Sequence, residues 1–339
     1  MNVIGVLTSG GDSQGMNAIV RSVVRTALSK GMKVMGIHNG YKGLIDGEVE
    51  ELTATSVSDI IAKGGTFLRT ARCLEFKEEA GILKAVESCK KFGIEGIVAI
   101  GGDGSFRGAR DLCLHGIKCV GIPGTIDNDI ACSEYTIGFD TCLNICIDCI
   151  DKLKDTAASH SRCSVVELMG RNADWVALEA GIMAGATAIL VPEVEFNLEK
   201  DVIARIEAAK ALGKNSFIVV VSEGIFANEK SNKNYEYVVS RGIANADALA
   251  KAIEEATKVT SRGTVLGHIQ RGGTPTAKDR GVASEMGYYA VTKLLANDIY
   301  NRVVIMKDGK VTDIDILEGL NMKKPFDFAR YEMANTINL

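Results

Sequence analysis

The stretch KCVGIPGTIDND, residues 118–129, runs from an apolar segment through a Pro-Gly turn into two aspartates. Asp127 and Asp129 are two residues apart, and an extended backbone would place both side chains on the same side. Two crowded carboxylates repel each other unless a positive group lies nearby. The stretch therefore predicts a buried strand whose carboxyl end holds something.

Short apolar runs alternate with helical stretches along the chain, a pattern typical of βαβ units and a parallel sheet. Helices are expected near residues 18–29 and over residues 82–91, and the rhythm begins again after about Phe139. The expected strands are VIGVL (3–7), KVMGI (33–37), IVAI (97–100), KCVGI (118–122), SVVEL (164–168), AILVP (188–192) and FIVVV (217–221). We predict an α/β fold with two similar halves.

Several expected strands end in turns that carry glycine or charge, namely SGGD, GGDGS, PGTIDND, MGR and SEG. Ligands bind beyond the carboxyl ends of parallel strands, so this recurrence predicts one shared cleft. The glycine pairs in TSGGD (8–12) and GGDGS (101–105) can turn backbone N–H groups toward phosphate. Neither turn has the spacing of a Walker loop or of a dinucleotide fingerprint. Asp103 would repel a bare anion and therefore indicates an intervening Mg²⁺.

Phosphoryl transfer to a hydroxyl requires a base for the alcohol proton and a carboxylate for the metal. Asp127 and Asp129 could divide these roles; the alternative is a solvated Asx turn. Positive charge must also converge on the polyanionic substrates. The candidates are Arg72, Arg162, Arg171, Arg262, His268 and Arg271. Any one of them alone could instead make a surface ion pair, but they stand beside glycines at strand ends.

The composition excludes several classes of protein. With 339 residues, 46% of them hydrophobic and 24% charged, the chain is expected to form about two globular domains. A net charge of −4 gives no basic surface for nucleic acid or an anionic membrane. No stretch approaches the ~18 consecutive apolar residues of a membrane span. The N-terminus has no basic region of an export signal, so we expect a cytoplasmic protein.

All nine cysteines lie between Cys73 and Cys163, and we expect them to be reduced. Cys142, Cys146 and Cys149 have the C-x3-C-x2-C spacing of an iron–sulfur site. The surrounding residues have helical periodicity, however, and a helix would separate the outer sulfurs by ~10 Å along its axis. We interpret these cysteines as small buried hydrophobic residues.

Ten stretches resemble those of one family, in the same order and over essentially the whole chain. The most specific are PGTIDNDI and TVLGHIQRGG, and the others are GVLTSGGD, GMNA, GGTF, IGGDGS, YTIGFDT, SVVELMGR, VPEVEF and NMKKPF. The chain resembles the ATP-dependent, bacterial type of 6-phosphofructokinase. The resemblance implies two Rossmann-like three-layer domains with the active site in the cleft between them. It places a nucleotide-binding domain at 1–139 plus about 270–320, and a sugar-phosphate-binding domain at about 140–269 plus 321–339.

The resemblance also implies the reaction, in which MgATP phosphorylates fructose 6-phosphate at the 1-hydroxyl to give fructose 1,6-bisphosphate, the committed step of glycolysis. The nucleotide would be held by Gly11, Arg72, Cys73, Gly102, Asp103, Gly104 and Ser105, and Mg²⁺ by Asp103 and Asp129. Asp127 would take the hydroxyl proton, with Thr125, Arg72 and Arg171 facing the transferring phosphoryl group. The sugar phosphate would contact Thr125, Asp127, Met169, Gly170, Arg171, Glu223, His268 and Arg271. Arg162 and Arg262 would come from a neighbouring subunit of a homotetramer.

Some positions differ within the resembling family. Gly104 and Gly124 stand where pyrophosphate-dependent members have aspartate and lysine, so ATP is the expected donor. Arg69 replaces a common glycine, and its charge could alter nucleotide affinity or point to solvent. The stretch GRNADWVAL also departs from the bacterial pattern. The polar segment 227–240 is expected to be an exposed loop or small excursion without assigned chemistry.

The effector site departs further. Arg21, Arg25 and Lys214 match the basic cluster that binds ADP and phosphoenolpyruvate in regulated members. Regulated members have arginine, arginine, glutamate and lysine where this chain has Ala54, Lys154, Thr187 and Leu212. We therefore expect a weak or altered effector response.

Two rival functions remain at this point. The same fold could phosphorylate another phosphosugar, such as sedoheptulose 7-phosphate or tagatose 6-phosphate. A non-catalytic sugar-phosphate sensor would be expected to have lost the base or a metal ligand, whereas Asp103, Asp127 and Asp129 are all present.

Overall fold

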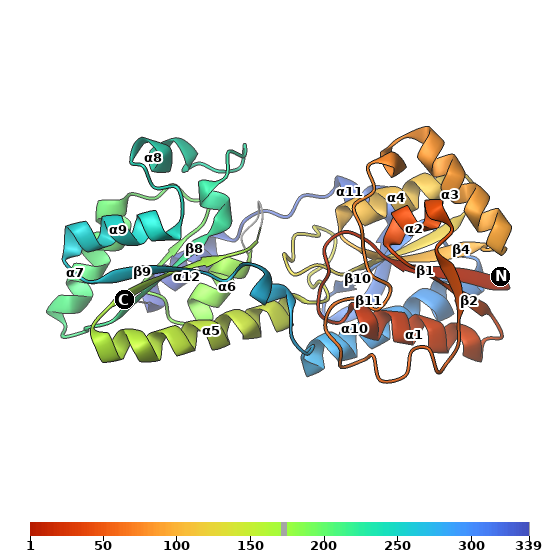
Figure 1. The fold of residues 1–339 in the computed structure, drawn as a ribbon, viewed down its shortest axis with the longest axis horizontal. Helices are drawn as coiled ribbons and strands as arrows, with labels where there is room; N and C mark the ends of the chain where they lie inside the picture. The colour runs from red at the N-terminus through yellow and green to blue at the C-terminus, as the bar shows by residue number, and fades with distance from the viewer. Residues whose placement is uncertain (171–174, 339) are drawn as a thin grey trace. The chain divides into compact units, whose positions relative to one another are not determined.

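The computed structural model describes residues 1–170 and 175–338. It divides into two compact units, one of Met1–Thr141 and Arg271–Lys324, the other of Cys142–Gln270 and Pro325–Leu339 (Figure 1). Each unit contains a sheet of mostly parallel strands with helices packed on it, so the predicted α/β fold class is confirmed. Within the described residues, no helix has the length and apolar character needed to cross a membrane.

The larger unit is built on a seven-stranded sheet with the order β11-β10-β5-β4-β1-β2-β3. Its strands are β1 (Val3–Thr8), β2 (Lys33–Ile37), β3 (Val49–Leu52), β4 (Gly96–Gly101), β5 (Lys118–Pro123), β10 (Arg302–Lys307) and β11 (Lys310–Asp315). The central strands are parallel, and the edge strands β3 and β11 are antiparallel to their neighbours. The chain leaves β1 for β2 on one side and later returns to β4 on the other. This reversal between β1 and β4 is where open α/β sheets bind ligands.

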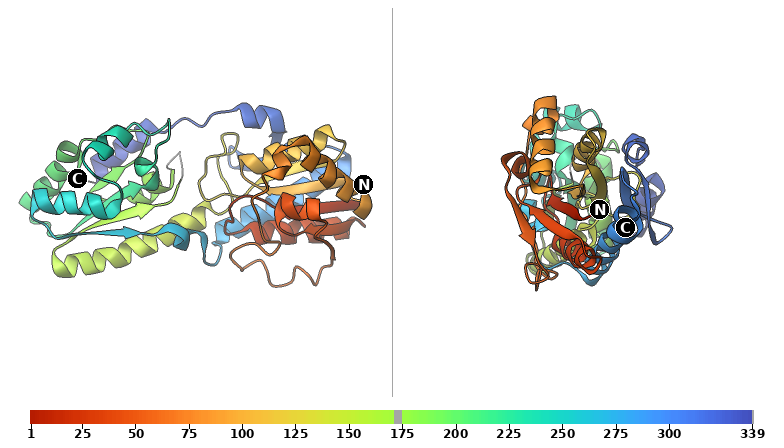
Figure 2. Two further views of the ribbon diagram at one scale, coloured as in Figure 1. Left: turned by 45° about the horizontal axis from the view of Figure 1, so that its top comes forward. Right: turned by 90° about the vertical axis from the view of Figure 1, so that its right-hand side faces the viewer.

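Helices cover both faces of this sheet (Figures 1 and 2). On one face, α1 (Met16–Ser29) packs against α10 (Ala277–Tyr289). The other face is covered by α2 (Gly40–Asp46), α3 (Glu79–Phe92), α4 (Asp103–Leu114) and α11 (Ile316–Asn321). Because both faces are covered, the central strands read as continuous apolar runs, and every residue of β4 is buried.

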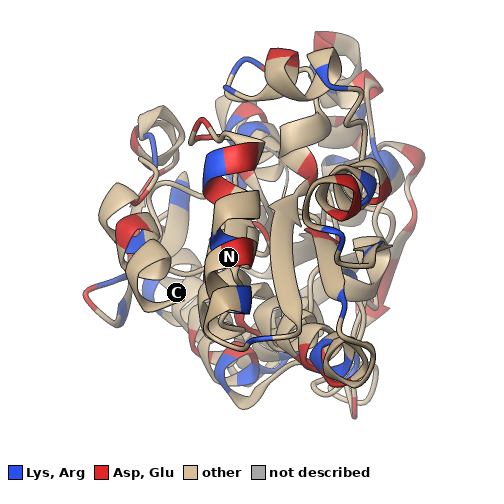
Figure 3. Ribbon diagram, turned by 90° about the vertical axis from the view of Figure 1, so that its left-hand side faces the viewer, with Lys and Arg blue, Asp and Glu red and all other residues tan. Residues whose placement is uncertain are grey.

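The smaller unit has a four-stranded parallel sheet with the order β7-β8-β6-β9. Its strands are β6 (Cys163–Leu168), β7 (Ala188–Leu190), β8 (Phe217–Ser222) and β9 (Ser261–Val265). Its helices are α5 (Phe139–His160), α6 (Trp175–Met183), α7 (Ala204–Ala211), α8 (Tyr235–Ser240), α9 (Ala246–Thr257) and α12 (Phe328–Ile337). Arg330 of α12 donates to both carboxylate oxygens of Glu179 on α6, which fastens the C-terminal helix to this unit. Charged residues of both signs are carried by the helices and loops (Figure 3).

Helix α5 carries the three closely spaced cysteines. Cys142 and Cys146 are buried and Cys149 is partly exposed, so the interpretation as helical hydrophobic residues is confirmed. All nine cysteines are free thiols in the described part of the chain.

The polar segment 227–240 is mostly exposed but is held by two buried asparagines. Asn232 and Asn234 are buried, and their amide groups bond backbone atoms of neighbouring turns. Asn232 Nδ2 donates to Ile225 O at 2.6 Å, and Asn234 Nδ2 donates to Val194 O at 2.9 Å. Most other residues of the segment are exposed, as expected, so the exposed excursion is anchored by these two buried asparagines, whose side chains bond backbone groups.

A buried carboxylate, Asp279 of α10, organises the segment that enters α5. Its oxygens accept hydrogen bonds from the Tyr135 hydroxyl, from Gly138 N at 2.8 Å, and from both the backbone N and the hydroxyl of Thr141. Burial raises the pKa of Asp279, and these four hydrogen bonds act in the opposite direction. Every partner is a donor, so the site requires an acceptor on both oxygens.

We predict that Asp279→Asn lowers the free energy of unfolding by about 3 kcal/mol, because the amide NH₂ would face donors left without an acceptor. Asp308→Asn, an exposed residue in a left-handed turn that asparagine also tolerates, is the control and should change it by less than about 0.5 kcal/mol. Urea denaturation measures both variants. Equal stability of the two variants would contradict the organising role of Asp279.

Candidate functional site

Three of the predicted loops lie side by side at the carboxyl edge of the seven-stranded sheet. They follow β1, β4 and β5, which are neighbours in the sheet. Ser9 N donates to Ile100 O at 2.9 Å, and Gly124 N donates to Gly101 O at 3.0 Å. The Ser105 hydroxyl donates to Ser9 O at 3.0 Å. The fold thus brings TSGGD, GGDGS and PGTIDND together, whereas MGR and SEG follow strands of the other sheet.

The glycines of GGDGS differ in what surrounds them. A Cβ on Gly101 would lie 2.3 Å from both Ser9 O and Ser105 Oγ, so this glycine allows the loops to pack. A Cβ on Gly102 or Gly104 would meet no atom within 4 Å. These two glycines flank the first residue of α4, a helix of 12 residues whose first N–H groups have no intrahelical acceptor. The open N-terminus of α4 can therefore bind a phosphate group.

Two carboxylates lie within electrostatic reach of each other at this helix N-terminus. The pKa of Asp103 is raised, first by partial burial and then by the negative charge of Asp129, while Arg107 acts in the opposite direction. Proteins hold Mg²⁺ with one or two carboxylates together with phosphate oxygens of the substrate. A carboxylate pair beside an open phosphate-binding turn has the donor chemistry that Mg²⁺ requires.

Asp127 has a different environment from Asp129. Asp127 is only 4% exposed, and its backbone N donates to Thr125 Oγ1 at 3.2 Å. Asn128, between the two aspartates, adopts a left-handed conformation with φ of 49°, which asparagine tolerates better than most residues. The expectation of an extended backbone at these positions was therefore wrong. The turn at Asn128 separates a buried carboxylate from a half-buried one.

Residues distant in the sequence hold this loop in place. The Thr136 hydroxyl donates to Thr125 O at 2.8 Å, and Lys324 Nζ donates to Asn128 O at 2.6 Å. Burial lowers the pKa of Lys324 to about 8, although the nearby Asp129 and Cys132 act in the opposite direction. Lys324 belongs to the NMKKPF stretch, and nothing in that stretch distinguishes the buried lysine from its neighbour.

Arg271, which was predicted to hold the sugar's 6-phosphate, lies beside the TSGGD loop together with predicted nucleotide-binding residues. Arg271 Nη1 donates to Asp12 O at 2.8 Å, and it would lie 2.8 Å from a Cβ placed on Gly11. The Thr70 hydroxyl donates to Gly10 O at 2.8 Å, which ties the segment of Arg72 and Cys73 to the loop. The Arg72 side chain is exposed, and Cys73 packs partly against the core.

Arg69, which replaces a glycine common in the resembling family, occupies a left-handed position with φ of 59°. Its carbonyl accepts a hydrogen bond from the Thr8 hydroxyl at 2.7 Å, and its side chain is exposed. The backbone conformation explains why glycine suits this position.

In the smaller unit, residues predicted to contact the sugar gather at the carboxyl ends of β6 and β8. Gly170 N donates to Glu223 Oε1 at 3.2 Å across these neighbouring strands. Gln270 is fully buried and bonds Met169 twice, accepting from its backbone N at 2.8 Å and donating to its O at 3.0 Å. The sequence analysis assigned no role to Gln270, although it lies in the specific GHIQRGG motif.

The remaining basic candidates are spread more widely. His268 is exposed in the turn of Gly267–Arg271, and Arg171 lies outside the described residues. Arg162 immediately precedes β6, and Arg262 pairs with Ser164 in the strand register of β9. At ~3.3 Å per residue, β6 separates these two arginines from Met169 by roughly 20 Å. The fold therefore does not bring Arg162 and Arg262 to the sugar residues of their own unit.

The predicted effector site lacks one carboxylate, because Thr187 stands where regulated members of the family have glutamate. Thr187 is buried, and its hydroxyl accepts a hydrogen bond from Ile218 N at 3.4 Å. Lys154 pairs with Asp151 at 3.1 Å on α5. Arg21 and Arg25 lie on α1, and Lys214 is exposed.

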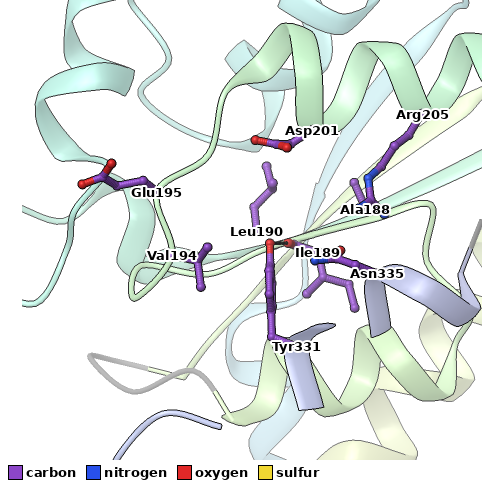
Figure 4. A pocket seen from close by; sticks show the side chains of 9 residues that line it. All are labelled: Ala188, Ile189, Leu190, Val194, Glu195, Asp201, Arg205, Tyr331 and Asn335. Carbon is purple, nitrogen blue, oxygen red and sulfur yellow. Dashed lines mark hydrogen bonds between the residues drawn. The ribbon is translucent and has the colours of Figure 1, made fainter. Parts of the chain in front are cut away.

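A pocket of about 80 Å³ lies elsewhere in the smaller unit (Figure 4). Its lining residues are Ala188, Ile189, Leu190, Val194, Glu195, Asp201, Arg205, Tyr331 and Asn335. Tyr331 donates to Ile189 O at 3.1 Å. Ligand pockets for small molecules usually measure ~300–1,000 Å³, so this one is too small for a nucleotide or a sugar phosphate.

Comparisons with known proteins agree with this arrangement of loops. Residues 3–294 match the Phosphofructokinase family. The ATP-dependent 6-phosphofructokinase of Clostridium botulinum (strain Hall) is 51% identical over 338 residues, which cover 100% of both chains. The chain belongs to the phosphofructokinase family. The family relative from Clostridium tetani, also described as ATP-dependent 6-phosphofructokinase, is 49% identical over the same length.

Solved structures of family members share the fold. Phosphofructokinase from Saccharomyces cerevisiae superposes with a TM-score of 0.83 at 31% identity, covering 94% of this chain and 45% of the yeast chain. A pyrophosphate-dependent phosphofructokinase from Marinobacter aquaeolei superposes with a TM-score of 0.83 at 22% identity, covering 97% of this chain and 86% of that chain. The second match shows the shared fold alone.

Proposed function

We propose that this phosphofructokinase transfers the γ-phosphoryl group of ATP to the 1-hydroxyl of fructose 6-phosphate, giving ADP and fructose 1,6-bisphosphate. The observation that carries the proposal is the grouping of the buried Asp127 with the Asp103–Asp129 pair beside the open N-terminus of α4. Full-length relatives with 51% identity and that named activity support it. The cytoplasm is its expected location, since the proposed reaction belongs to glycolysis.

In the proposed mechanism, the nucleotide is held by Gly11, Arg72, Cys73 and the backbone of Gly102–Ser105. Asp103 and Asp129 would hold Mg²⁺, which when bound neutralises phosphate charge. Asp127 accepts the proton of the 1-hydroxyl as the oxygen attacks phosphorus. Thr125, Arg72 and Arg171 are assigned to the transferring phosphoryl group, where the two arginines would offset its negative charge.

The sugar phosphate is assigned to Met169, Gly170, Glu223 and His268 of the smaller unit, together with Arg271 of the larger unit. The reaction requires the sugar-binding residues and the nucleotide-binding residues to act in one site. The family resemblance predicts that this site is a cleft between the two domains. Other phosphosugars would bind through the same phosphate-binding groups. An activity assay is therefore needed to distinguish fructose 6-phosphate from these acceptors.

ATP is the proposed donor because Gly104 has free space beside it, whereas Gly124 is closely packed. The open space beside Gly104 leaves room for the additional phosphate of a nucleotide. A Cβ on Gly124 would already lie 3.1 Å from Met16 Cε and 3.2 Å from Ile100 Cγ2, so the lysine of pyrophosphate users does not fit there without displacement.

A homotetramer with shared active sites is the proposed assembly. Its support is the placement of Arg162 and Arg262 at the amino ends of β6 and β9, away from the sugar residues of the same unit. Arg262 lies on an edge strand with a side chain that is 66% exposed, and its guanidinium pairs with Glu254 at 3.3 Å. In the proposed tetramer this surface ion pair would give way to the sugar phosphate of another subunit.

A coupled assay for fructose 1,6-bisphosphate tests the proposal. We predict at least tenfold faster turnover with ATP than with pyrophosphate, and with fructose 6-phosphate than with sedoheptulose 7-phosphate or tagatose 6-phosphate. Asp127→Ser should lower kcat about 10²–10⁴-fold through loss of the base. The KM for fructose 6-phosphate should stay within about threefold, because the 6-phosphate is held by other groups. Asp308→Asn is the control with parental kinetics, and an Asp127→Ser enzyme with ordinary turnover would refute the assignment.

Weak effector control is a separate prediction from the altered residues at the effector positions. Phosphoenolpyruvate should shift the half-saturating fructose 6-phosphate concentration by less than about fivefold, the lower end of allosteric coupling, because cations and a carboxylate are missing. Titration of the purified enzyme with phosphoenolpyruvate, and separately with ADP, measures this. Steep sigmoidal inhibition by phosphoenolpyruvate would overturn it.

A further inference from the structure

Lys324 is the last residue of the larger unit before the chain passes into Pro325–Leu339 of the smaller one. Unlike the exposed Lys323 beside it, Lys324 is partly buried and directs its ammonium group to the loop of the two aspartates. Its Nζ donates to Asn128 O at 2.6 Å across 196 positions of sequence. This hydrogen bond therefore joins the segment where the chain passes from one unit to the other to the proposed active-site loop.

The bonded carbonyl has a particular place in that loop. Asn128 O belongs to the peptide group that joins Asn128 to Asp129, and a peptide group is planar. A hydrogen bond at this oxygen therefore fixes the plane from which Asp129 projects. Asn128 is 7% exposed, and its left-handed φ of 49° is a conformation that needs support from its surroundings.

Lys324 also supplies charge next to the carboxylate pair. Asp129 and Cys132 are the groups whose charges act on its ammonium, and Asp129 in turn acts on Asp103. The ammonium of Lys324 and the carboxylate of Asp103 therefore both act on the charge of Asp129. The ammonium offsets part of the repulsion between the two carboxylates.

We propose that Lys324 is a positioning residue for the phosphoryl transfer, which orients Asp129 by holding the Asn128–Asp129 peptide group and by balancing the carboxylate charge. The inference rests on the proposed function of this site. Lys324 acts through Asp129 and is assigned no contact with substrate. Its loss frees the peptide plane, so the metal-binding carboxylate loses its direction while the sugar residues of the other unit are unchanged.

The test compares Lys324→Met and Lys324→Arg with Lys323→Met, the matched neighbour. Lys324→Met should lower kcat about 10- to 100-fold, in the range for groups that support metal ligands, and raise the Mg²⁺ concentration for half-maximal rate several-fold. The KM for fructose 6-phosphate should stay within about twofold. Lys324→Arg should recover most of the activity, since a guanidinium also donates to a carbonyl and carries the charge. Lys323→Met should match the parent.

Calorimetric binding of magnesium with a non-hydrolysable ATP analogue gives a readout independent of turnover, and Lys324→Met should weaken it several-fold. Thermal unfolding is measured in parallel, and the Tm of Lys324→Met should fall by less than about 5 °C. Parental kcat and magnesium dependence in Lys324→Met would overturn the proposal. Equal losses in Lys323→Met and Lys324→Met, or failure of Lys324→Arg to restore activity, would also overturn it. An inactive parent enzyme would instead refute the proposed function.

Discussion

Repulsion between two carboxylates is the constraint on which the site depends. Asp103 and Asp129 come from loops after β4 and β5, and the parallel sheet places these strands next to each other. Partial burial raises the pKa of Asp103, and the negative charge of Asp129 raises it further. Such a pair is stable at neutral pH only when positive charge is nearby, which a bound cation and the ammonium of Lys324 can supply. A magnesium ion at this pair is therefore the central element of the proposed function.

The same loop contains a second carboxylate with different properties. Asp127 is buried and Asp129 is half-buried, although a single residue separates them. The left-handed turn at Asn128 produces this difference, because it interrupts the strand geometry that would have placed both on one side. One short loop then presents two carboxylates in different environments, to which the proposed function assigns the roles of base and metal ligand.

The sequence allowed the central strands and the loops that follow them to be predicted. Strands β1, β4 and β5 are covered on both faces, so they read as apolar runs, and the loops after them met as parallel-sheet geometry requires. The edge strands β3, β9 and β11 were missed because strands such as VEEL and KVTDID have only one neighbour and carry polar residues. Strand β10 (RVVIMK) is an apolar run that was passed over.

The side chains that hold the loops of the site in place could not be predicted from the sequence. Lys324 and Asn128 are 196 positions apart, and only the folded chain shows which of two adjacent lysines turns inward. Gln270 bonds Met169 at a distance of 101 positions, again without a local pattern. The chemical groups within a loop can be read from its local sequence. The residues that hold the loop in place come from distant parts of the chain, and only the fold shows which of them reach it.

The most direct measurement is a crystal structure of this enzyme with magnesium and a non-hydrolysable ATP analogue. The account predicts a magnesium ion coordinated by an oxygen of Asp103 or Asp129 at about 2.1 Å, or held by one of these carboxylates through a coordinated water, with phosphate oxygens at the backbone of Gly102–Ser105. A metal bound away from both aspartates, with the phosphates outside the Gly102–Ser105 turn, would contradict it.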